Sequence, residues 1–260
     1  MPDPSEHKQT VRRAFTEQAT AYAAKTSVSD PKRIARLVDA AGVTSTDSVL
    51  EVATGPGHVA FGFADHCEGV VGVDLTRAPL QIARETQRER ETGNVDFVRG
   101  DAEDLPFPPD AFDVVVCRLA LHHVERPRRM VREMARVCRP NGTVAIGDLV
   151  VSEHSGRAEY QNTFERLRDP SHVRALPISE LIDVVTGRGV EIDHLETGEV
   201  VQNVEDWLAT AETPEPRAVD VREMLREDAE ADLSGTRPFW RDGELFFSQQ
   251  TAIVAGRLLE

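Results

Sequence analysis

The stretch Val49-Leu50-Glu51-Val52-Ala53-Thr54-Gly55-Pro56-Gly57, residues 49–57, decides the fold of this chain. Its apolar first half predicts a buried strand, and the two glycines predict a tight turn into a helix. A second apolar run, Gly69–Asp74, follows and ends on an acid. A strand, a glycine turn and an acid at the tip of the next strand together surround a nucleotide-sized space. The functional site is therefore expected at this place.

Strands and helices alternate along the middle of the chain. Five strands are predicted, at Ser48–Val52, Gly69–Asp74, Val95–Arg99, Phe112–Cys117 and Thr143–Val150. Several are near-continuous Val/Ile runs, which are typical of strands covered on both faces and hence of a parallel sheet. The helices expected between and after them include Arg128–Val137 and Ser179–Thr186, with Ser179 as the cap of the second.

The N-terminal flank predicts two helices. One spans Val11–Ala24, and the other starts at Asp30-Pro31, as cap and first helical residue, and stops at Gly42.

The C-terminal flank is less regular. Strands are predicted at Val190–Leu195 and Leu245–Gly256, with a polar, acidic and helical segment over 204–233 between them. Residues 153–176 and 204–240 interrupt the core pattern and are natural places for a lid or an acceptor pocket.

Composition narrows the class of protein. The 260 residues carry a net charge of −15, and Lys8, Lys25 and Lys32 are the only lysines. Such an acidic chain repels phosphates, so no nucleic-acid partner is expected. An excess of acids with few lysines also fits a protein that works in high salt. GC-rich coding is the alternative explanation for the use of arginine in place of lysine. With no apolar run long enough for a membrane span and no signal peptide at the start, we expect a cytoplasmic protein without a membrane span.

The cysteines do not indicate a structural framework. Cys67, Cys117 and Cys138 are odd in number and lack CxxC spacing, so we expect packing roles and no metal site.

Residues at three successive strand ends suggest a bound nucleoside. Gly55 and Gly57 leave room for a ligand at the backbone, and the N–H groups of the following helix face it. Asp74 is placed to accept hydrogen bonds from two ribose hydroxyls. Asp101 is placed for an adenine amino group, with the Ala102 N–H beside it and Leu75 over one adenine face. Taken singly, the glycine pair is also explained by a tight turn and each aspartate by a helix cap; the joint arrangement favours the ligand.

A family resemblance rests on several further motifs. They are residues 49–57, Gly72-Val73-Asp74, Gly100-Asp101-Ala102-Glu103-Asp104-Leu105-Pro106-Phe107, Phe112-Asp113-Val114-Val115, Leu121-His122-His123-Val124 and Arg136-Val137-Cys138-Arg139-Pro140-Asn141-Gly142. With these motifs the chain resembles the class I S-adenosylmethionine-dependent methyltransferases, in the group that includes the ubiquinone/menaquinone-biosynthesis methyltransferases. The match is strong over roughly residues 45–150 and weak in the flanks.

The resemblance implies an architecture. It implies an α/β, Rossmann-like, seven-stranded and mostly parallel sheet, with helices on both faces and one antiparallel strand near the C-terminus. Residues 1–44 would form helices that cover the cofactor site. Residues 45–260 would form the methyltransferase domain, with insertions near 152–176 and 203–242 on the acceptor side.

The resemblance also implies S-adenosylmethionine as the cofactor. The residues that it places at the cofactor are Tyr22, Glu51, Ala53, Thr54, Gly55, Gly57, Asp74, Leu75, Asp101, Ala102 and Arg118. Glu51 and the turn after it would face the methionine part, and Arg118 would border it through its backbone. Phe15 and Tyr22 resemble aromatic residues that close over the cofactor in related enzymes. The family often has glycine where this chain has Ala53, which narrows the turn slightly.

Methyl transfer requires the acceptor and the methyl group to be held in line, and a base where the acceptor must lose a proton. His122 and His123 follow the fourth strand and are the candidate catalytic residues. The alternative is that they only shape the pocket.

Two further segments have open roles. Residues 168–174, with Arg168, His172 and Arg174, either line a polar or anionic acceptor pocket together with His154 or form a charged surface turn. Phe239-Trp240 is either a lid anchor or packing.

The predicted function is methyl transfer to a small-molecule acceptor. One rival is an NAD(P)-dependent oxidoreductase, because Gly55-Pro56-Gly57-His58-Val59-Ala60 fits GxGxxA. Another is a non-catalytic protein that binds S-adenosylmethionine. The identity of the acceptor, the acceptor atom and the oligomeric state stay open.

Overall fold

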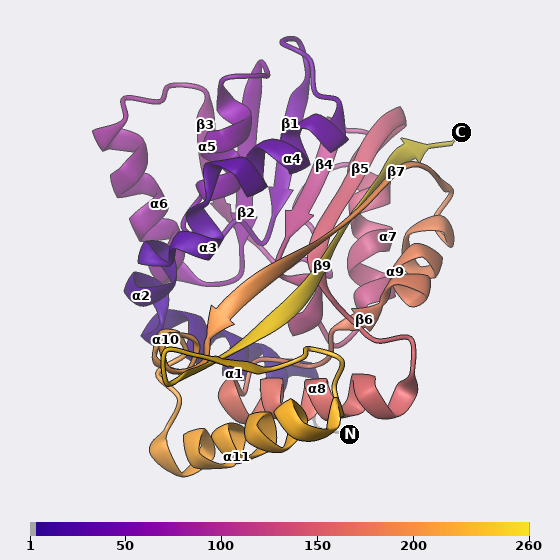
Figure 1. Ribbon diagram of the computed structural model, residues 1–260. Coiled ribbons are helices and arrows are strands. Elements are labelled where there is room, and N and C mark those ends of the chain that lie inside the picture. The colour runs from indigo at the N-terminus through magenta and orange to yellow at the C-terminus, as the bar shows by residue number, and fades with distance from the viewer. Residues whose placement is uncertain (1–3, 260) are drawn as a thin grey trace.

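The computed structural model describes residues 4–259 and has one central sheet flanked by helices (Figure 1). Its main path is β3 (Val95–Arg99), β2 (Gly69–Asp74), β1 (Ser48–Val52), β4 (Phe112–Arg118), β5 (Cys138–Val151), β9 (Glu244–Leu258) and β7 (Val190–Asn203). Neighbours from β3 to β5 are parallel, and β9 runs antiparallel to both β5 and β7. The predicted seven-stranded, mostly parallel sheet with one antiparallel C-terminal strand is confirmed.

Two short strands lie off this path. β6 (Leu176–Pro177) pairs with β5, and β8 (Phe239–Arg241) forms a hairpin with β9. The hairpin turns at Asp242 and Gly243, whose φ values of 53° and 84° suit a two-residue turn. Phe239 and Trp240 thus belong to an edge hairpin, and Trp240 is exposed.

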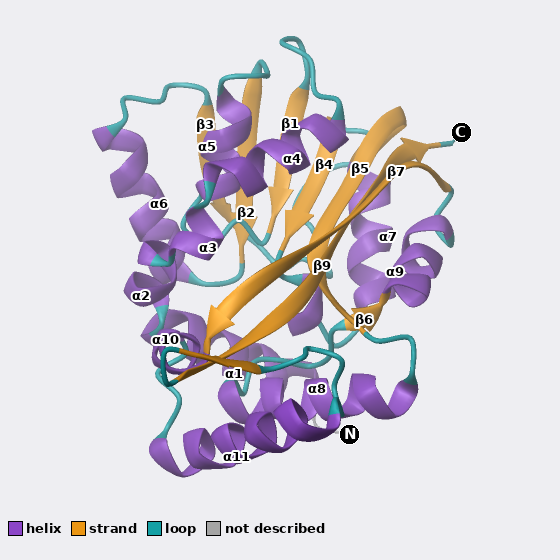
Figure 2. Ribbon diagram, in the orientation of Figure 1, coloured by secondary structure: helices purple, strands orange, loops and turns teal. Residues whose placement is uncertain are grey.

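Helices cover both faces of the sheet (Figure 2). One face carries α4 (Pro31–Ala41), α5 (His58–Ala64) and α6 (Arg77–Glu89), and the other carries α7 (Pro127–Val137) and α9 (Ile178–Thr186). The first core includes Leu37, Phe63, Leu80 and Val116, and the second includes Leu50, Met130, Met134 and Leu181. The Val/Ile-rich strands are buried on both sides, as their composition predicts.

A third apolar core joins the two segments that interrupt the alternation. It lies among α8 (Ser155–Arg168), α10 (Val204–Thr210), α11 (Glu215–Ala231) and the start of β9. Phe164, Trp207 and Phe247 pack edge to face, with ring centroids 4.7–6.0 Å apart. In Figure 1, α8 and α11 lie beyond the ends of the parallel strands, close to α1 (Pro4–Glu17). The two insertions therefore form one layer beside the ends of the strands.

The N-terminal helices differ from the prediction in extent. Instead of one helix over Val11–Ala24, α1 is followed by α2 (Ala19–Ala24) and α3 (Thr26–Ser29). The break falls at Gln18, whose buried side chain donates to the carbonyl of Ala211 at 3.3 Å. The Asp30 cap of α4 is confirmed, as is its end at Gly42 with φ of 60°.

Other boundaries also differ, and β5 begins at Cys138 and not at the predicted Thr143. β7 and β9 extend beyond Val190–Leu195 and Leu245–Gly256, because the two strands pair along their full length and satisfy polar backbone that the apolar pattern does not mark. Ser179 is not a cap, because α9 begins at Ile178. Its hydroxyl and N–H instead donate to the Glu153 carboxylate. Residues 1–3 and 260 of the two expected units lie outside the described residues. None of the described helices is long and apolar enough to cross a membrane.

Candidate functional site

A cavity of about 1010 Å³, partly open to solvent, lies at the carboxyl ends of β1, β2 and β4. We call it the first cavity. The strand order reverses between β1 and β4, and open α/β sheets bind their ligands at such a switch point. Its walls include eleven of the predicted site residues: Tyr22, Glu51, Ala53, Thr54, Gly55, Asp74, Leu75, Asp101, Ala102, Arg118 and His123. Gly57 is not on its wall, and His122 lines a neighbouring cavity instead.

The turn after β1 has unusual backbone geometry. Ala53, Gly55 and Gly57 have φ values of 60°, 54° and 84°. A side chain is strained in this left-handed region, so Ala53 is held there against its own preference. A Cβ on Gly55 would meet no atom within 4 Å, which leaves space on the cavity wall, whereas a Cβ on Gly57 would lie 2.8 Å from Phe97. Gly57 is thus required by packing, and Gly55 leaves room for a ligand.

Glu51 is buried at the end of β1, with 2% of its surface exposed. Its Oε2 accepts hydrogen bonds from the Thr54 hydroxyl at 2.5 Å and from the Ala60 N–H at 2.8 Å. Burial raises the pKa of this carboxyl to about 8, despite the two donors. Glu51 therefore holds the turn against the first turn of α5, and at neutral pH it is mostly protonated.

Asp74 at the end of β2 also holds the glycine turn. One carboxylate oxygen accepts from the Gly55 N–H and the other from the Thr76 N–H, both at 2.8 Å. Burial raises its pKa although both backbone bonds favour the charged form. Because a carboxylate oxygen accepts more than one hydrogen bond, Asp74 keeps capacity for a ligand.

Asp101 is tied to the first helix. Its Oδ2 lies 2.6 Å from Lys8 Nζ, which also lies 2.6 Å from the Glu103 carboxylate. Its Oδ1 accepts from the Glu103 N–H at 2.9 Å. Lys8 thus fastens α1 to the loop after β3, over the part of the cavity where the sequence places adenine.

Aromatic side chains of the N-terminal helices form another wall. Phe15 and Tyr22 meet edge to face at 5.8 Å, and both line the first cavity. His58 on α5 bonds to the Ala23 carbonyl at 3.0 Å, which ties α2 to the core. Arg118 donates to the Val28 carbonyl at 2.8 Å. These contacts hold residues 4–29 against the strand ends.

A second cavity of about 1000 Å³, partly open to solvent, adjoins the first. The two share the wall residues Phe15, Tyr22, Val28, Arg118, Leu119 and His123. The second cavity extends from there to β5, β7, β9 and the ends of α8 and α10, where Arg168, Trp207 and Gln249 line it. Leu119 stands between the cavities with φ of 52°, a strained geometry of the kind that gathers at functional sites.

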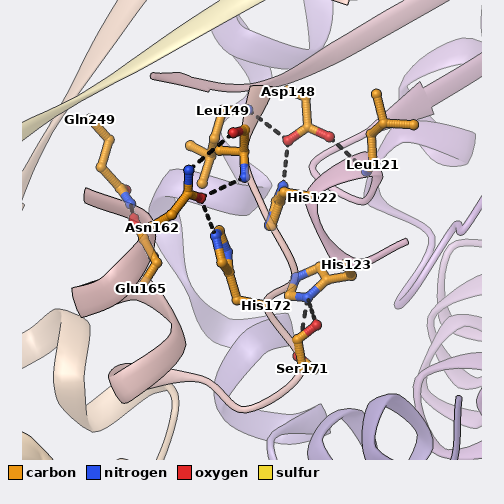
Figure 3. Close-up of polar contacts among 11 residues, drawn as sticks. Leu121, His122, His123, Asp148, Leu149, Asn162, Glu165, Ser171, His172 and Gln249 are labelled. Carbon is orange, nitrogen blue, oxygen red and sulfur yellow. Dashed lines mark hydrogen bonds and ion pairs between the residues drawn. The ribbon is translucent and has the colours of Figure 1, made fainter. Parts of the chain in front are cut away.

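His122 and Asp148 form a buried pair on the wall of the second cavity (Figure 3). Asp148 Oδ1 accepts from His122 Nδ1 at 2.5 Å and from the Leu149 N–H at 2.6 Å, and Oδ2 accepts from the Leu121 N–H at 2.6 Å. Because a carboxylate only accepts, Nδ1 carries the proton and Nε2 of the neutral ring is the acceptor. Within residues 4–259, Nε2 has no hydrogen-bond partner.

The charges of this pair are set by their mutual contact. Burial acts to lower the pKa of His122, but the charge of Asp148 and the bond to it outweigh burial and raise that pKa. Burial acts to raise the pKa of Asp148, and His122 with the two backbone donors lowers it. Asp148 therefore stays ionised and makes His122 a stronger base.

His123 and His172 have structural contacts. His123 Nδ1 lies 3.0 Å from both the carbonyl and the hydroxyl oxygen of Ser171. The pKa of His123 is lowered mainly by burial and also by the charge of the neighbouring His122. His172 Nε2 donates to Asn162 at 2.8 Å, and its pKa is lowered by burial. Figure 3 shows the His122, His123 and His172 rings grouped together, with His122 next to Asp148.

Residues 168–174 have mixed roles. Arg168 lines the second cavity, stacks 4.6 Å from the Trp207 ring centre and donates to the Trp207 carbonyl, so it is not part of a surface turn. Arg174 instead pairs with Glu180 at the surface, and neither it nor His172 lines either of the two cavities. His154 is an exposed residue at the start of α8.

Sequence reasoning missed three residues of the site. Lys8 carried a signal, as one of only three lysines in the chain. Asp148 lies inside an apolar strand run, where an isolated acid marks a buried partner or a ligand. Nothing in the sequence marks Leu119, because its strain comes from a left-handed backbone conformation that the folded chain imposes. No group of three or more metal-ligating His, Cys, Asp or Glu side chains occurs among the described residues.

Comparison with known proteins agrees with this geometry. The sequence pattern of a family described as "Methyltransferase domain" matches residues 50–146. An uncharacterized methyltransferase of Bacillus subtilis, YcgJ, is 30% identical over 203 residues, which cover 78% of this chain and 80% of YcgJ. The crystal structure of YcgJ superposes with a TM-score of 0.83 at 27% identity, over 88% of this chain and 99% of that one.

Two other proteins match more distantly. The ubiquinone/menaquinone biosynthesis C-methyltransferase UbiE of Idiomarina loihiensis is 37% identical over 113 residues, 42% of this chain and 45% of UbiE. A geranyl diphosphate methyltransferase solved in complex with S-adenosylmethionine has the same fold, with a TM-score of 0.63 at 15% identity over 93% of this chain and 90% of that one. On the strength of the YcgJ match and the shared fold, this chain belongs to the class I S-adenosylmethionine-dependent methyltransferases.

Proposed function

We propose that the chain binds S-adenosylmethionine in the first cavity and transfers its methyl group to a small molecule in the second. The observation that carries this proposal is the wall shared by the two cavities at the switch point of the sheet. Most of the predicted cofactor-binding residues line the first cavity, and the His122–Asp148 pair lines the second. A donor and an acceptor in these two cavities would meet beside the pair.

The residues of the first cavity fit the cofactor. The Glu51 and Asp74 carboxyls are acceptors suited to an ammonium group and to ribose hydroxyls, and Gly55 leaves space beside them. When bound, S-adenosylmethionine supplies an electrophilic methyl group and leaves as the thioether S-adenosylhomocysteine. The same-fold geranyl diphosphate methyltransferase was solved with this cofactor, which supports the assignment.

The residues of the chain would then have distinct tasks. Residues of the 1–44 unit, with Phe15 and Tyr22 on the wall, cover the cofactor and exclude water from it. The insertions near 152–176 and 203–242 enclose the acceptor, since Arg168 and Trp207 line the second cavity. His122 removes the acceptor's proton at Nε2, and Asp148 holds its ring in the required tautomer. His123 shapes the shared wall and stays neutral.

Binding and turnover test the proposal separately. Calorimetry should detect S-adenosylhomocysteine binding, and Asp74→Ala should weaken it by roughly 1–3 kcal/mol through lost charge-assisted hydrogen bonds. Asp113→Ala removes a carboxylate at the opposite ends of the strands, bonded to Ser48 and Arg139, and should leave this affinity unchanged. Equal affinities of the two variants would place the cofactor elsewhere.

The rival functions are separated by two further measurements. Tight NADH binding without S-adenosylhomocysteine binding would favour an oxidoreductase. Incubation with methyl-labelled S-adenosylmethionine and a metabolite extract should yield a labelled small molecule. Cofactor binding with a persistent absence of any labelled product would favour a non-catalytic binding protein.

A further inference from the structure

The second cavity has the opposite charge balance to the chain around it. The whole chain has 45 acids against 30 Lys and Arg residues. Among the described residues, the wall of the second cavity carries five cations and three carboxylates: Lys25, Arg33, Arg36, Arg118 and Arg168 against Asp148, Asp169 and Glu196. His122 and His123 also line it. A basic recess inside an acidic protein concentrates anions that the outer surface repels.

The three carboxylates of this wall are already engaged. Asp148 is held by His122 and two backbone donors. Glu196 pairs with Arg36 at 2.6 Å. Asp169 accepts from the N–H and the hydroxyl of Ser171 at 2.8 and 2.6 Å. Within the described part of the chain Asp169 makes no ion pair within 4.0 Å, and its charge and that of Arg168 act on each other's pKa across a longer distance.

Two of the cations have no carboxylate partner. Neither Lys25 nor Arg168 lies within 4.0 Å of an acidic side chain among residues 4–259, whereas Arg33 pairs with Asp30 and Arg36 with Glu196. The nearby Glu165 is buried and accepts from Gln249. Burial raises its pKa, while the charges of Arg168 and Lys25 act to lower it. Burial and the neighbouring Arg168 lower the pKa of Lys25 to about 7. Two cations that disfavour each other in this way would be relieved by an anion between them.

We propose that the methyl acceptor carries a carboxylate or phosphate group, and that Lys25 and Arg168 bind this group in the second cavity. The inference rests on the proposed function and adds the chemical class of the acceptor. Lys25 supplies a compact charge and Arg168 a planar fork of donors, backed by the Trp207 ring. The anionic group would anchor the acceptor at the ends of α2 and α8, while its nucleophilic atom faces His122.

Trp207 provides a direct readout, because the chain has only two tryptophans and the other, Trp240, is exposed. In a Trp240→Phe background, the emission of Trp207 is titrated with benzoate, with phenyl phosphate and with the uncharged benzamide, at constant ionic strength. Saturable binding of an anion at least tenfold tighter than benzamide is expected. The tighter of the two anions identifies carboxylate or phosphate as the preferred group.

Charge-matched variants assign the site. Lys25→Met should weaken anion binding roughly tenfold or more, while Lys32→Met, at an exposed position on α4 that lines neither of the two cavities, should have no effect. Arg168→Lys keeps the charge and loses the fork, and should weaken binding less than Arg168→Met. Equal binding of benzamide, no saturable anion binding, or equal effects of Lys25→Met and Lys32→Met would overturn the inference. Titration of S-adenosylhomocysteine into the same preparations separates a failure of this inference from a failure of the proposed function. Normal cofactor binding without a preference for anions refutes only this inference. Absent cofactor binding refutes the proposed function.

Discussion

Replacing Asp148 by asparagine tests the proposed base directly. The carboxylate receives three donors, of which His122 and Leu149 bond to Oδ1 and Leu121 bonds to Oδ2. An amide has a single acceptor oxygen. If that oxygen takes the Oδ1 position, the amide N–H groups face the Leu121 N–H. If it takes the Oδ2 position, they face His122 and favour the tautomer with the proton on Nε2, which cannot act as a base.

The magnitudes follow from these contacts. One buried donor left without an acceptor costs about 1–3 kcal/mol of stability. For a chain of this size, each kcal/mol lowers Tm by about 2–4 °C. Loss of general-base catalysis lowers kcat by about 10²–10⁴-fold. The affinity for S-adenosylhomocysteine should change less than about twofold, since Asp148 does not line the first cavity.

The pH profile gives a second readout. Since the base must be neutral and the pKa of His122 is raised, kcat/KM of the native enzyme should rise with pH through a value above the ordinary ~6.5. Asp148→Asn removes the charge that raises this pKa, so the residual activity should rise at lower pH. Labelled-methyl transfer from S-adenosylmethionine at a series of pH values measures both effects.

A matched variant controls for damage to the fold. Asp228 is equally buried and accepts from the Ser234 N–H and hydroxyl and from the Thr236 hydroxyl, but it lines neither of the two cavities. Asp228→Asn should lower Tm comparably and keep kcat. Full activity in Asp148→Asn with an unshifted pH profile would refute the assignment of His122 as base.

Three more predictions concern the turn, the cofactor and the surface. Ala53→Gly should raise the free energy of unfolding in urea by up to ~1 kcal/mol, because glycine adopts a left-handed backbone without strain. Gly57→Ala should lower that free energy by ~1–3 kcal/mol, because its Cβ would meet Phe97. A lower stability of Ala53→Gly would show that Ala53 is not strained. Since the pKa of Glu51 is about 8, binding of an ammonium group beside it at pH 7 should release close to one proton from the carboxyl. Calorimetry in two buffers of different ionisation enthalpy should detect this proton release. Proton release that persists in Glu51→Gln would exclude Glu51 as its source. With a net charge of −15, Tm should rise from 0.1 M to ~1 M KCl as the Debye length falls from about 10 to 3 Å, and a constant Tm would count against adaptation to salt.

Local sequence signals determined the centre of the fold. The strands β1, β2 and β3 have the predicted bounds, because each is a short run rich in apolar residues and bounded by turn residues. β1 is buried on both faces, whereas the edge strand β3 alternates buried and exposed residues. The glycine turn and the acids at the strand ends line one cavity, because parallel strands bring their carboxyl ends to the same edge of a sheet. For the same reason most of the predicted cofactor residues could be named from short-range pattern alone.

Long-range contacts decided the rest. The buried side chain of Gln18, at the break between α1 and α2, bonds to a carbonyl 193 residues away, and the length of β7 depends on its pairing with β9. No local pattern shows that Asp148 would meet His122, or that Lys25 and Arg168 would share one wall without a carboxylate between them. The chain alone thus predicted the proposed donor site, since that prediction follows from strand ends and turns. The proposed base and the charge of the proposed acceptor cavity were decided by tertiary structure, because they depend on side chains from distant elements that meet only in the folded protein.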